Sequence, residues 1–393
     1  MSCASTAPAH NNVPATNPFF RSGKTIRYSM KVHWRVIHAA RNSYAALYAA
    51  GESAGYILRP VDAPEPDVTC FSLNSINEPR YRDEIASADC ITIVGGPHAT
   101  ARYQETVRYA DYVVVGEGEH TLPLLLASIE NGDERPVPGV ATQEGYEPAR
   151  HSVLLDAFPA FSQMKGYVEI SRGCPFSCGY CQTPRIFGSC MRHRSIDAIA
   201  TYANRYEHAR FVSPNAFAYG SDGIHPRWEK IEHLFRRLSH RIWFGTFPSE
   251  VRPEFVCDEA LSLLSRYCAN TKLHFGAQSG SDDVLARLRR GHTVSDVVSA
   301  VELCQDYGIT PVVDFILGFP FETGYDQHKT AEMIAWVAER GLVHAHRFLP
   351  LPGTPLEGTV PSPILPETAH LCGKLALSGR LTGSWEDPQV RFF

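Results

Sequence analysis

Residues 171–184 read Ser-Arg-Gly-Cys-Pro-Phe-Ser-Cys-Gly-Tyr-Cys-Gln-Thr-Pro and follow the apolar run Tyr167–Ile170. The stretch places Cys174, Cys178 and Cys181 at CxxxCxxC spacing on one short loop. Three thiolates on one loop suit a soft metal ion or an iron–sulfur cluster. A closed zinc or four-iron site needs a fourth ligand, and the loop itself offers none.

One alternative is a structural zinc knuckle completed by Cys190 or His193. Zinc sites usually combine two CxxC pairs, or Cys and His at regular spacing, and this loop has neither pattern. The sequence therefore favours an iron–sulfur cluster with one open iron, where a substrate can bind.

With Tyr180 before its last cysteine, the loop resembles the cluster loop of the radical S-adenosylmethionine (radical SAM) enzymes. The Ser-Arg-Gly-Cys-Pro lead-in is similar to the branch that carries an extra N-terminal domain. The resemblance implies that Cys174, Cys178 and Cys181 are the metal ligands of a catalytic 4Fe–4S cluster. It further implies that S-adenosylmethionine chelates the open iron and is cleaved by one electron to a 5′-deoxyadenosyl radical.

Length and composition set the frame for this interpretation. A chain of 393 residues favours two domains, and 44% hydrophobic residues is ordinary for a globular protein. The net charge of −5 does not indicate the strongly basic surface that is typical of nucleic-acid-binding proteins. No apolar run approaches the ~18 residues of a membrane span. We expect neither nucleic acid nor membrane as a partner.

Eleven scattered cysteines indicate reduced thiols, a cytoplasmic location and an oxygen-sensitive cluster. Residues 1–26 lack signal-peptide features and are expected to be a flexible arm.

Residues 27–135 alternate between helical and extended patterns. We expect an Ala-rich helix within 27–53, capped by Ser43 and ended by Gly51, and another helix over Thr121–Glu130. The expected strands are Tyr56–Pro60, Val68–Leu73, Cys90–Val94 and Tyr112–Val115. This alternation predicts an α/β fold with a doubly wound, Rossmann-like parallel sheet.

Glycine-rich loops follow two of these strands, as Gly95-Gly96-Pro97-His98 and Gly116-Glu117-Gly118-Glu119. The carboxyl edge of such a sheet is where ligands bind, and glycines let backbone amides approach them closely. The GxGxxG dinucleotide fingerprint is absent.

The pattern resembles the cobalamin-binding domain of cobalamin-dependent radical SAM enzymes. The resemblance implies that these loops and the Ser72–Asn77 loop line the corrinoid. The cofactor-binding residues it implies are Ser72, Asn74, Ser75, Gly95, Gly96, Pro97, His98, Gly116, Glu117, Gly118 and Glu119. The DxHxxG motif that supplies a lower histidine is missing, so we expect a corrinoid without that ligand and a structural role for His98.

Residues 136–166 are expected to be a linker, 167–350 a partial (β/α)6 barrel, and 351–393 a short extension with a helix over Glu367–Leu377 and an apolar end at Val390–Phe393. The expected barrel strands are Tyr167–Ser171, Phe211–Ser213, Ile242–Phe247, Lys272–Gly276, Pro311–Ile316 and Leu342–Leu349. Functional residues of barrels lie where the strands end.

The resemblance assigns several of these strand ends to S-adenosylmethionine. Gln278 and Ser279 match the stretch that meets its ribose and carboxylate, although Gln278 replaces the usual Glu. Ser213 and Asn215 stand where the common Gly-Gly-Glu segment receives the amine. The adenine contacts it implies are Tyr180, Ile316 and Gly318. Residues Arg289–Thr293 are interpreted either as a carboxylate contact or as a solvated helix end.

Together, the two resemblances imply a cobalamin-dependent radical SAM methyltransferase, which carries a methyl group from methylcobalamin to an unactivated carbon. By family analogy the acceptor is a Gln or Arg side chain of a partner protein such as methyl-coenzyme M reductase, or a small molecule. The reductant would be of the ferredoxin or flavodoxin type. Three alternatives stay open: radical rearrangement or cyclisation of a small metabolite, methylthio transfer to tRNA, and a non-catalytic corrinoid or iron–sulfur carrier.

Overall fold

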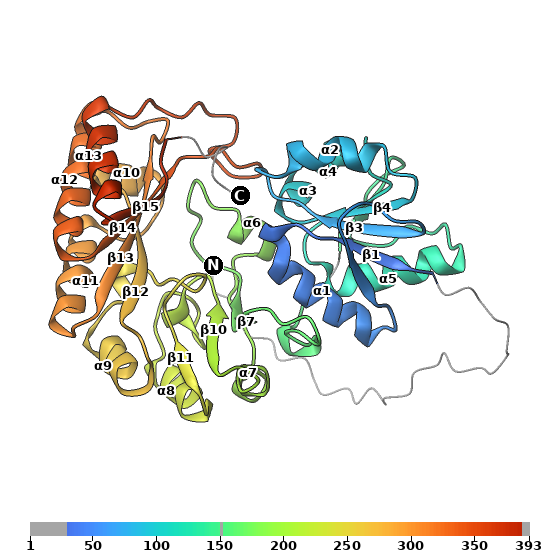
Figure 1. Ribbon diagram of the computed structural model, residues 1–393, viewed down its shortest axis with the longest axis horizontal. Helices are drawn as coiled ribbons and strands as arrows, with labels where there is room; N and C mark the ends of the chain where they lie inside the picture. The colour runs from blue at the N-terminus through green and yellow to red at the C-terminus, as the bar shows by residue number, and fades with distance from the viewer. Residues whose placement is uncertain (1–29, 150–151, 387–393) are drawn as a thin grey trace.

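The computed structural model describes residues 30–149 and 152–386, which form two α/β lobes side by side (Figure 1). One lobe contains the strands from Val32 to Ala141, and the other contains those from Val168 to Ser384. The short helix α6 (Thr183–Phe187), which ends the cysteine loop, lies between the lobes in this view. The cysteine loop is therefore close to the boundary between them.

The N-terminal lobe is built on one sheet with strand order β2-β1-β3-β4-β5-β6. Its strands are β1 (Val32–Arg35), β2 (Leu58–Val61), β3 (Val68–Ser72), β4 (Ile91–Gly95), β5 (Tyr112–Val114) and the antiparallel β6 (Val140–Ala141). Its helices are α1 (Arg41–Ser53), α2 (Glu78–Ala86), α3 (Pro97–Ala101), α4 (Tyr103–Thr106) and α5 (Gly118–Asn131). Helices α1 and α5 pack together in one hydrophobic cluster, and α2 and α3 contribute to a second. Helices on both faces confirm the doubly wound fold.

Several boundaries in this lobe differ from the sequence prediction. Strand β1 occupies part of the stretch predicted as helix, because Val32 and Trp34 are buried in the sheet. Ser43 lies inside α1 and does not cap it, and the helix continues two residues beyond Gly51. Helix α5 begins at Gly118, so the second glycine loop enters the first turn of the helix.

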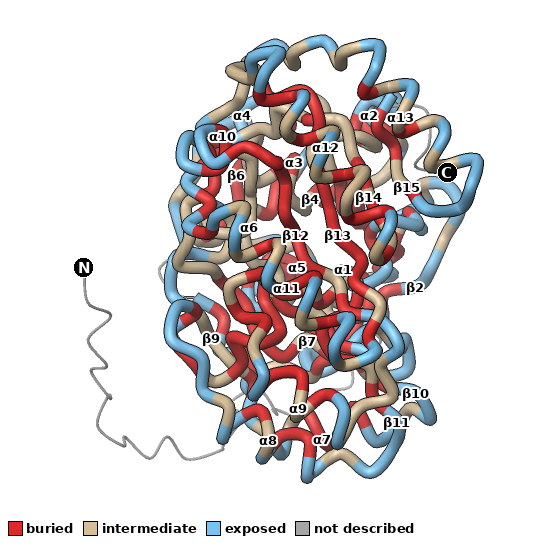
Figure 2. The backbone as a smooth tube through the Cα atoms, turned by 90° about the vertical axis from the view of Figure 1, so that its left-hand side faces the viewer, coloured by how far each residue is buried: buried red, intermediate tan, exposed pale blue. Residues whose placement is uncertain are grey.

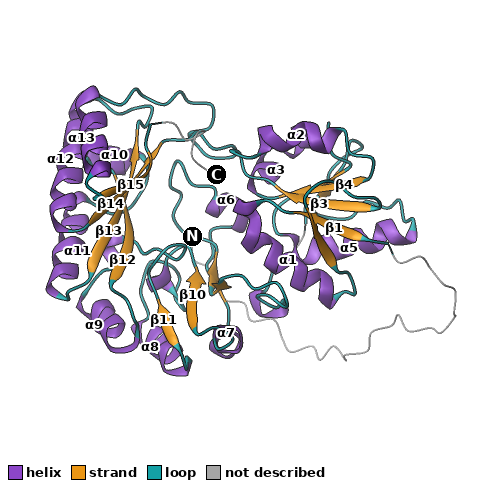
Figure 3. Ribbon diagram, viewed as in Figure 1, coloured by secondary structure: helices purple, strands orange, loops and turns teal. Residues whose placement is uncertain are grey.

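The second lobe is a partial barrel made of two sheets (Figure 3). One contains β7 (Val168–Glu169), β10 (His208–Val212) and β11 (Arg241–Trp243), and the other β12 (Lys272–Gln278), β13 (Thr310–Leu317), β14 (Leu342–Arg347) and β15 (Leu381–Ser384). A parallel bridge joins Val251, in the segment after β11, to Phe275 of β12. The helices are α7 (Ile196–Ala203), α8 (Trp228–Arg237), α9 (Asp258–Tyr267), α10 (Asp282–Arg287), α11 (Val294–Asp306), α12 (Gly324–Arg340) and α13 (Pro366–Leu377). A hairpin of β8 (Ser171–Arg172) and β9 (Arg192–His193) flanks the cysteine loop.

The core of this lobe lies between the strands and the outer helices, where the tube of Figure 2 is mostly buried along β12 and β13. The six predicted parallel strands are present, and the α/β fold class is confirmed. The parallel strand β15 is an addition, because residues 381–384 pair with β14. It falls in the stretch predicted as an extension, as β6 falls in the predicted linker. Residues 1–29 and Val390–Phe393 lie outside the described residues.

Short 3-10 turns complete the fold at His38–Ala40, Leu155–Ala157, Ala216–Ala218 and Pro253–Phe255. Thr293 and Thr323 form capping boxes with Asp296 and Asp326, which fix where α11 and α12 begin. In the described part of the chain, no helix has both the length and the apolar character needed to cross a membrane.

Candidate active site

The three cysteines of the loop lie between β8 and α6. Cys178 is buried, and Cys174 and Cys181 are half-buried. No three Cys, His, Asp or Glu side chains within residues 30–149 and 152–386 surround one metal-ion position. A zinc knuckle requires such a group, whereas each thiolate of a 4Fe–4S cluster binds a different iron and stands further from the others. The donor set fits the cluster better than it fits zinc.

The far side of the barrel holds this loop in place. The amide of Gly179 donates to the carbonyl of Leu288 at 2.9 Å, and Nη1 of Arg290 lies 3.9 Å from Sγ of Cys178. The Arg252 guanidinium stacks on the Phe176 ring, with Cζ 3.5 Å from the centroid, and donates to the carbonyl of Arg290. Both arginines bring positive charge to a loop that will carry thiolates.

The Arg289–Thr293 segment is only partly a solvated helix end: Arg289, Gly291 and Thr293 are exposed, whereas two of its side chains are buried. Arg290 and His292 are buried, with 8% and 5% exposure. Burial and the nearby charges of Arg290 and Arg252 lower the pKa of His292 to about 2, so this imidazole is neutral. Gly291 itself is exposed, and a Cβ atom on it would meet the Phe176 ring of the cysteine loop.

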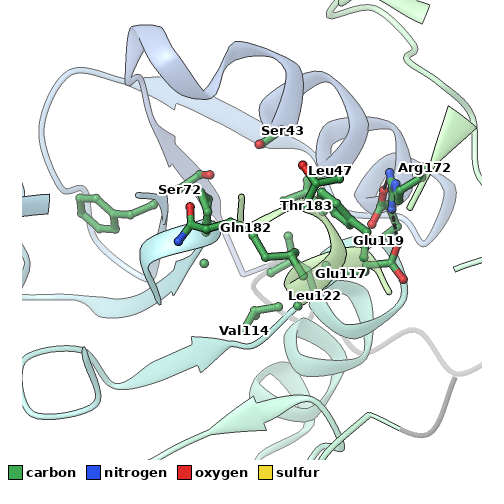
Figure 4. A pocket seen from close by; sticks show the side chains of 18 of the residues that line it. Ser43, Leu47, Ser72, Val114, Glu117, Glu119, Leu122, Arg172, Gln182 and Thr183 are labelled. Carbon is green, nitrogen blue, oxygen red and sulfur yellow. Dashed lines mark hydrogen bonds and ion pairs between the residues drawn. The ribbon is translucent and has the colours of Figure 1, made fainter. Parts of the chain in front are cut away.

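A cavity of about 540 Å³ lies between the two lobes (Figure 4). Its floor is the carboxyl edge of the N-terminal sheet, and α6 faces it with Gln182, Thr183 and Ile186. The apolar lining consists of side chains from both lobes, namely Trp34, Leu47, Phe71, Ile93, Val114, Leu122, Ile186, Phe187 and Leu351.

Most of the residues predicted to bind the corrinoid line this cavity: Ser72, Gly95, Gly96, Pro97, Gly116, Glu117, Gly118 and Glu119. Asn74, Ser75 and His98 do not line it. Asn74 accepts hydrogen bonds from two amides of its own turn, and His98 Nδ1 lies 3.2 Å from Ser75 Oγ. The structure therefore supports the expected structural role of His98.

Two glycines give this cavity room for a large planar ligand. A Cβ atom on Gly116, where φ is +86°, would meet nothing within 4 Å, and one on Gly95 would make only ordinary contacts with Val114. The surface is therefore an open, mostly apolar cradle edged by backbone amides. Such a lining fits a corrinoid ring.

Glu117 and Glu119 form ion pairs across the boundary between the lobes. Arg172 donates to Glu117 at 2.7 Å, to Glu119 at 2.6 Å and to Glu169 at 2.6 Å, and Arg192 also bonds Glu117. Burial alone raises the pKa of Glu117, but the hydrogen bonds from Arg192 and Arg172 outweigh it and leave the pKa below its ordinary value. The sequence does not reveal this network, because Arg172 and Glu119 are 53 residues apart in the chain.

A second cavity, of about 450 Å³, lies inside the barrel. Of the residues predicted to contact S-adenosylmethionine, Tyr180, Gln278 and Ile316 line it. Asn215 is adjacent to the lining residue Pro214, and among the described residues nothing hydrogen-bonds to Nδ2 or Oδ1 of its buried amide. Gln278 has a left-handed φ of +69°. Orphaned polar atoms and a strained backbone are typical of ligand sites.

The other predicted contacts are less direct. The Ser213 hydroxyl accepts from the amide of Asn215, and Ser279 Oγ pairs with Thr330 Oγ1. Gly318 lies at the end of β13 with φ of +86°, and its amide donates to Glu322. These three residues do not line the barrel cavity and shape the loops around it.

The two cavities meet at the cysteine loop, because Tyr180, Cys181 and Leu351 line both. A ligand on the sheet edge of one lobe and a ligand in the barrel of the other would approach each other there.

Comparison with known proteins agrees with this arrangement. The model of the radical SAM superfamily matches residues 168–334. A tRNA-2-methylthio-N(6)-dimethylallyladenosine synthase of Sulfurihydrogenibium sp. is 30% identical over 258 residues, covering 63% of this chain and 56% of that relative. A threonylcarbamoyladenosine tRNA methylthiotransferase of Thermotoga maritima is 30% identical over 229 residues, covering 52% and 50%. The chain spans about half the length of these curated relatives.

Two solved structures share both lobes. The radical S-adenosylmethionine methyltransferase TsrM of Kitasatospora setae, with cobalamin and a 4Fe–4S cluster bound, superposes with a TM-score of 0.65 at 16% identity, covering 84% of this chain and 74% of that one. The cobalamin-dependent radical enzyme OxsB, with aqua-cobalamin and S-adenosylmethionine bound, gives 0.60 at 15% identity, covering 77% and 51%. The radical SAM fold implies a 4Fe–4S cluster and S-adenosylmethionine. Residues 168–334 therefore match the radical SAM superfamily, and the two-lobe fold is similar to that of cobalamin-dependent radical SAM enzymes.

Proposed function

We propose that this protein is a cobalamin-dependent radical SAM methyltransferase that methylates an unactivated carbon. The observation that carries the proposal is the junction of the two cavities at Tyr180, Cys181 and Leu351. A methyl donor on the sheet edge and a radical source in the barrel must both reach one acceptor carbon, and this junction is open to both.

Cys174, Cys178 and Cys181 would hold the 4Fe–4S cluster, and the cradle of Gly95 and Gly116 would hold the corrinoid. When bound, the cluster supplies the electron that cleaves S-adenosylmethionine to a hydrogen-abstracting radical, and the corrinoid supplies the methyl group.

The chain itself orients and shields these groups. Arg252 and Arg290 lie beside the loop, line the barrel cavity and are suited to receive a carboxylate. The apolar walls of the cavity between the lobes keep water from a reactive carbon.

Methylthio transfer to RNA is the second candidate, because the sequence relatives named above carry that activity in their names. That reaction would call for a second cluster and a basic RNA-binding module. The net charge of −5 does not point to such a basic module. The meeting of the two cavities at the cysteine loop supports methyl transfer.

Product analysis tests the proposal. Reconstituted protein, S-adenosylmethionine, a low-potential reductant of the ferredoxin or flavodoxin type and candidate acceptors are incubated without oxygen. Methyl-coenzyme M reductase peptides with Gln or Arg are the first acceptors to try. Formation of both S-adenosylhomocysteine and 5′-deoxyadenosine supports the proposal, with Cys178→Ser as the inactive control. Deoxyadenosine alone would favour a rearrangement, and a methylthio product would favour the second candidate. If none of these products forms, a non-catalytic carrier is favoured.

A further inference from the structure

One side chain at the passage between the two cavities does not belong to the cysteine loop. Among the described residues, Tyr180, Cys181 and Leu351 line both cavities. The first two are part of the loop, and the Tyr180 ring packs against Phe319 with the centroids 6.0 Å apart. Leu351 comes from residues 349–359, the bridging segment, which follows β14 and reaches the N-terminal lobe (Figure 1). Leu351 is therefore the wall of the passage that the bridging segment supplies.

Gln182, which lies in the cavity between the lobes (Figure 4), holds the backbone beside Leu351. Its Nε2 donates to the carbonyl of Pro352 at 2.8 Å, and Pro352 directly follows Leu351. The Leu351 carbonyl accepts from the amide and the hydroxyl of Thr354, at 3.3 and 2.7 Å. The proline ring restricts φ at position 352, so these bonds leave the turn little freedom. Because Gln182 directly follows Cys181, its bond fixes Leu351 relative to the cysteine loop.

Two further contacts place the bridging segment between the lobes. The amide of Leu356 donates to the carbonyl of Gly179 at 3.2 Å, which is a second bond to the cysteine loop. On the other side, Glu357 forms an ion pair with Arg102, the residue after α3. Helix α3 begins directly after Gly96 of the first glycine loop. The segment therefore contacts an element of each cavity.

The size of the side chain at position 351 decides how wide the passage is. Leu351 is half-buried, and among the described residues it belongs to no hydrophobic core cluster. A shorter side chain there would widen the passage at little cost in core packing. A larger one would narrow it, because Tyr180 is packed against Phe319, which is fully buried and has no room to move away.

We propose that Leu351 limits the size of a group that extends from one cavity into the other, and that Gln182 positions Leu351 for this role. Leu351 is then a specificity-determining residue for the acceptor, which must reach both ligands through this passage. Gln182 acts through Leu351, by holding the carbonyl of Pro352. The proposal rests on the proposed function, since it assumes that a corrinoid binds in the cavity between the lobes.

Equilibrium binding of two corrinoids tests the proposal without turnover. Hydroxocobalamin carries a small group on cobalt, whereas adenosylcobalamin carries a 5′-deoxyadenosyl group that would have to enter the passage. Both are titrated spectroscopically into the reconstituted protein, in the dark and without reductant. We expect the wild type to bind hydroxocobalamin about tenfold more tightly than adenosylcobalamin, because Leu351 crowds the larger group. S-adenosylmethionine should weaken the binding of adenosylcobalamin alone, because the two adenosyl groups compete for the barrel cavity.

Substitutions of Leu351 should change the ratio of the two affinities. Leu351→Ala should reduce the preference for hydroxocobalamin about fivefold, and Leu351→Trp should weaken adenosylcobalamin binding about tenfold further. Hydroxocobalamin binding should change by less than about threefold in either variant, because its small group does not reach the passage. Leu377→Trp, the same substitution at a position of α13 that is 93% exposed, is the matched control and should change nothing. The iron content, which should match the wild type, shows that each variant folds.

A double substitution tests whether Gln182 acts through Leu351. Gln182→Glu keeps the size of the side chain, but its carboxylate has no hydrogen to donate to the carbonyl of Pro352. We expect this variant to reduce the preference for hydroxocobalamin about threefold, and to have no further effect when combined with Leu351→Ala. Gln305→Glu, at an exposed position of α11, is the matched control.

Three results would overturn the proposal. The affinity ratio could stay the same in both Leu351 variants while hydroxocobalamin binds normally, which overturns this proposal alone. Gln182→Glu could change the ratio equally with and without Leu351→Ala, which would show that Gln182 does not act through Leu351. The wild type could bind neither corrinoid, in which case the proposed function fails and this proposal fails with it.

Discussion

Arg172 Nη2 donates to Oε1 of Glu119 at 2.6 Å across the boundary between the lobes. Arg172 stands two residues before the first cysteine of the loop, and Glu119 lies in the first turn of α5 after the second glycine loop. The same guanidinium also binds Glu117 and Glu169. One buried cation therefore links the cysteine loop to the glycine loop that faces it.

Arg172→Ala should destabilise the protein strongly. The Arg172 side chain is 8% exposed, and its removal leaves Glu119 and Glu169 without the cation that they share. Breaking a buried network of this kind typically costs about 3–5 kcal/mol. Denaturant unfolding measures the loss, and Arg135→Ala, which removes an exposed ion pair on the N-terminal lobe, should lower stability far less. Equal effects of the two substitutions would contradict the role assigned to Arg172.

The same network predicts acid sensitivity. The folded-state pKa of Glu117 is below its ordinary value of 4.5, so its ion pairs contribute stability that is present above pH 4.5 and is lost as the pH falls below that value. The difference in unfolding free energy between the wild type and Glu117→Gln should therefore be largest near neutral pH and shrink on acidification. A difference independent of pH would show that this carboxylate is not held ionised.

Glu322 should show the opposite dependence. Burial raises its pKa to about 7, although the amides of Gly318 and Phe319 donate to it, and its Oε1 has no partner in the described structure. Because the charged form is disfavoured in the folded state, wild-type stability should fall as the pH rises from 4.5 to about 7. Glu322→Gln should match the wild type at pH 5 and exceed it at pH 8, by about 1–3 kcal/mol. Thermal unfolding at the two pH values checks this, and a Gln variant that is weaker at pH 8 would refute it.

Substitution of a loop cysteine and substitution of Cys190 should have different effects on the iron content of the protein. Cys178→Ser should lose most of the iron after reconstitution, because a 4Fe–4S cluster with three protein ligands rarely survives the loss of one. Cys190→Ser is the matched control: Cys190 is exposed and lies outside the CxxxCxxC spacing, so iron should be unchanged. Loss of bound zinc from the Cys190 variant would instead revive the zinc knuckle.

A large side chain introduced into the cavity between the lobes should block corrinoid binding. Gly95 lines it with an ordinary φ, and its Cβ position has only van der Waals contacts with Val114, so Gly95→Ala should fold and bind a corrinoid normally. Gly95→Phe should lower corrinoid affinity by tenfold or more and leave the iron content intact. Spectroscopic titration with hydroxocobalamin measures both, and unchanged binding by the Phe variant would exclude this cavity as the corrinoid site.

The sequence predicted what is local and periodic. The cysteine spacing, the glycines after β4 and β5, and the alternation of strands and helices each lie within a few residues, so the two-lobe α/β fold could be recognised. Partners far apart in the chain could not be. Nothing near Arg172 identifies Glu119, and strand β15 depends on a pairing with β14 that crosses an entire helix. Asp314 did leave a signal, because a lone acid inside the apolar run from Val312 to Leu317 is unusual for a buried strand. Its partner His344 becomes visible only when the sheet brings β13 and β14 together.

The most direct test of the two-cofactor account is the stoichiometry of iron, sulfide and cobalt after anaerobic reconstitution with hydroxocobalamin. The account predicts about four irons, four sulfides and one corrinoid per chain. Four irons without cobalt would contradict it, because the cavity between the lobes would then need another ligand and the methyl donor would be missing.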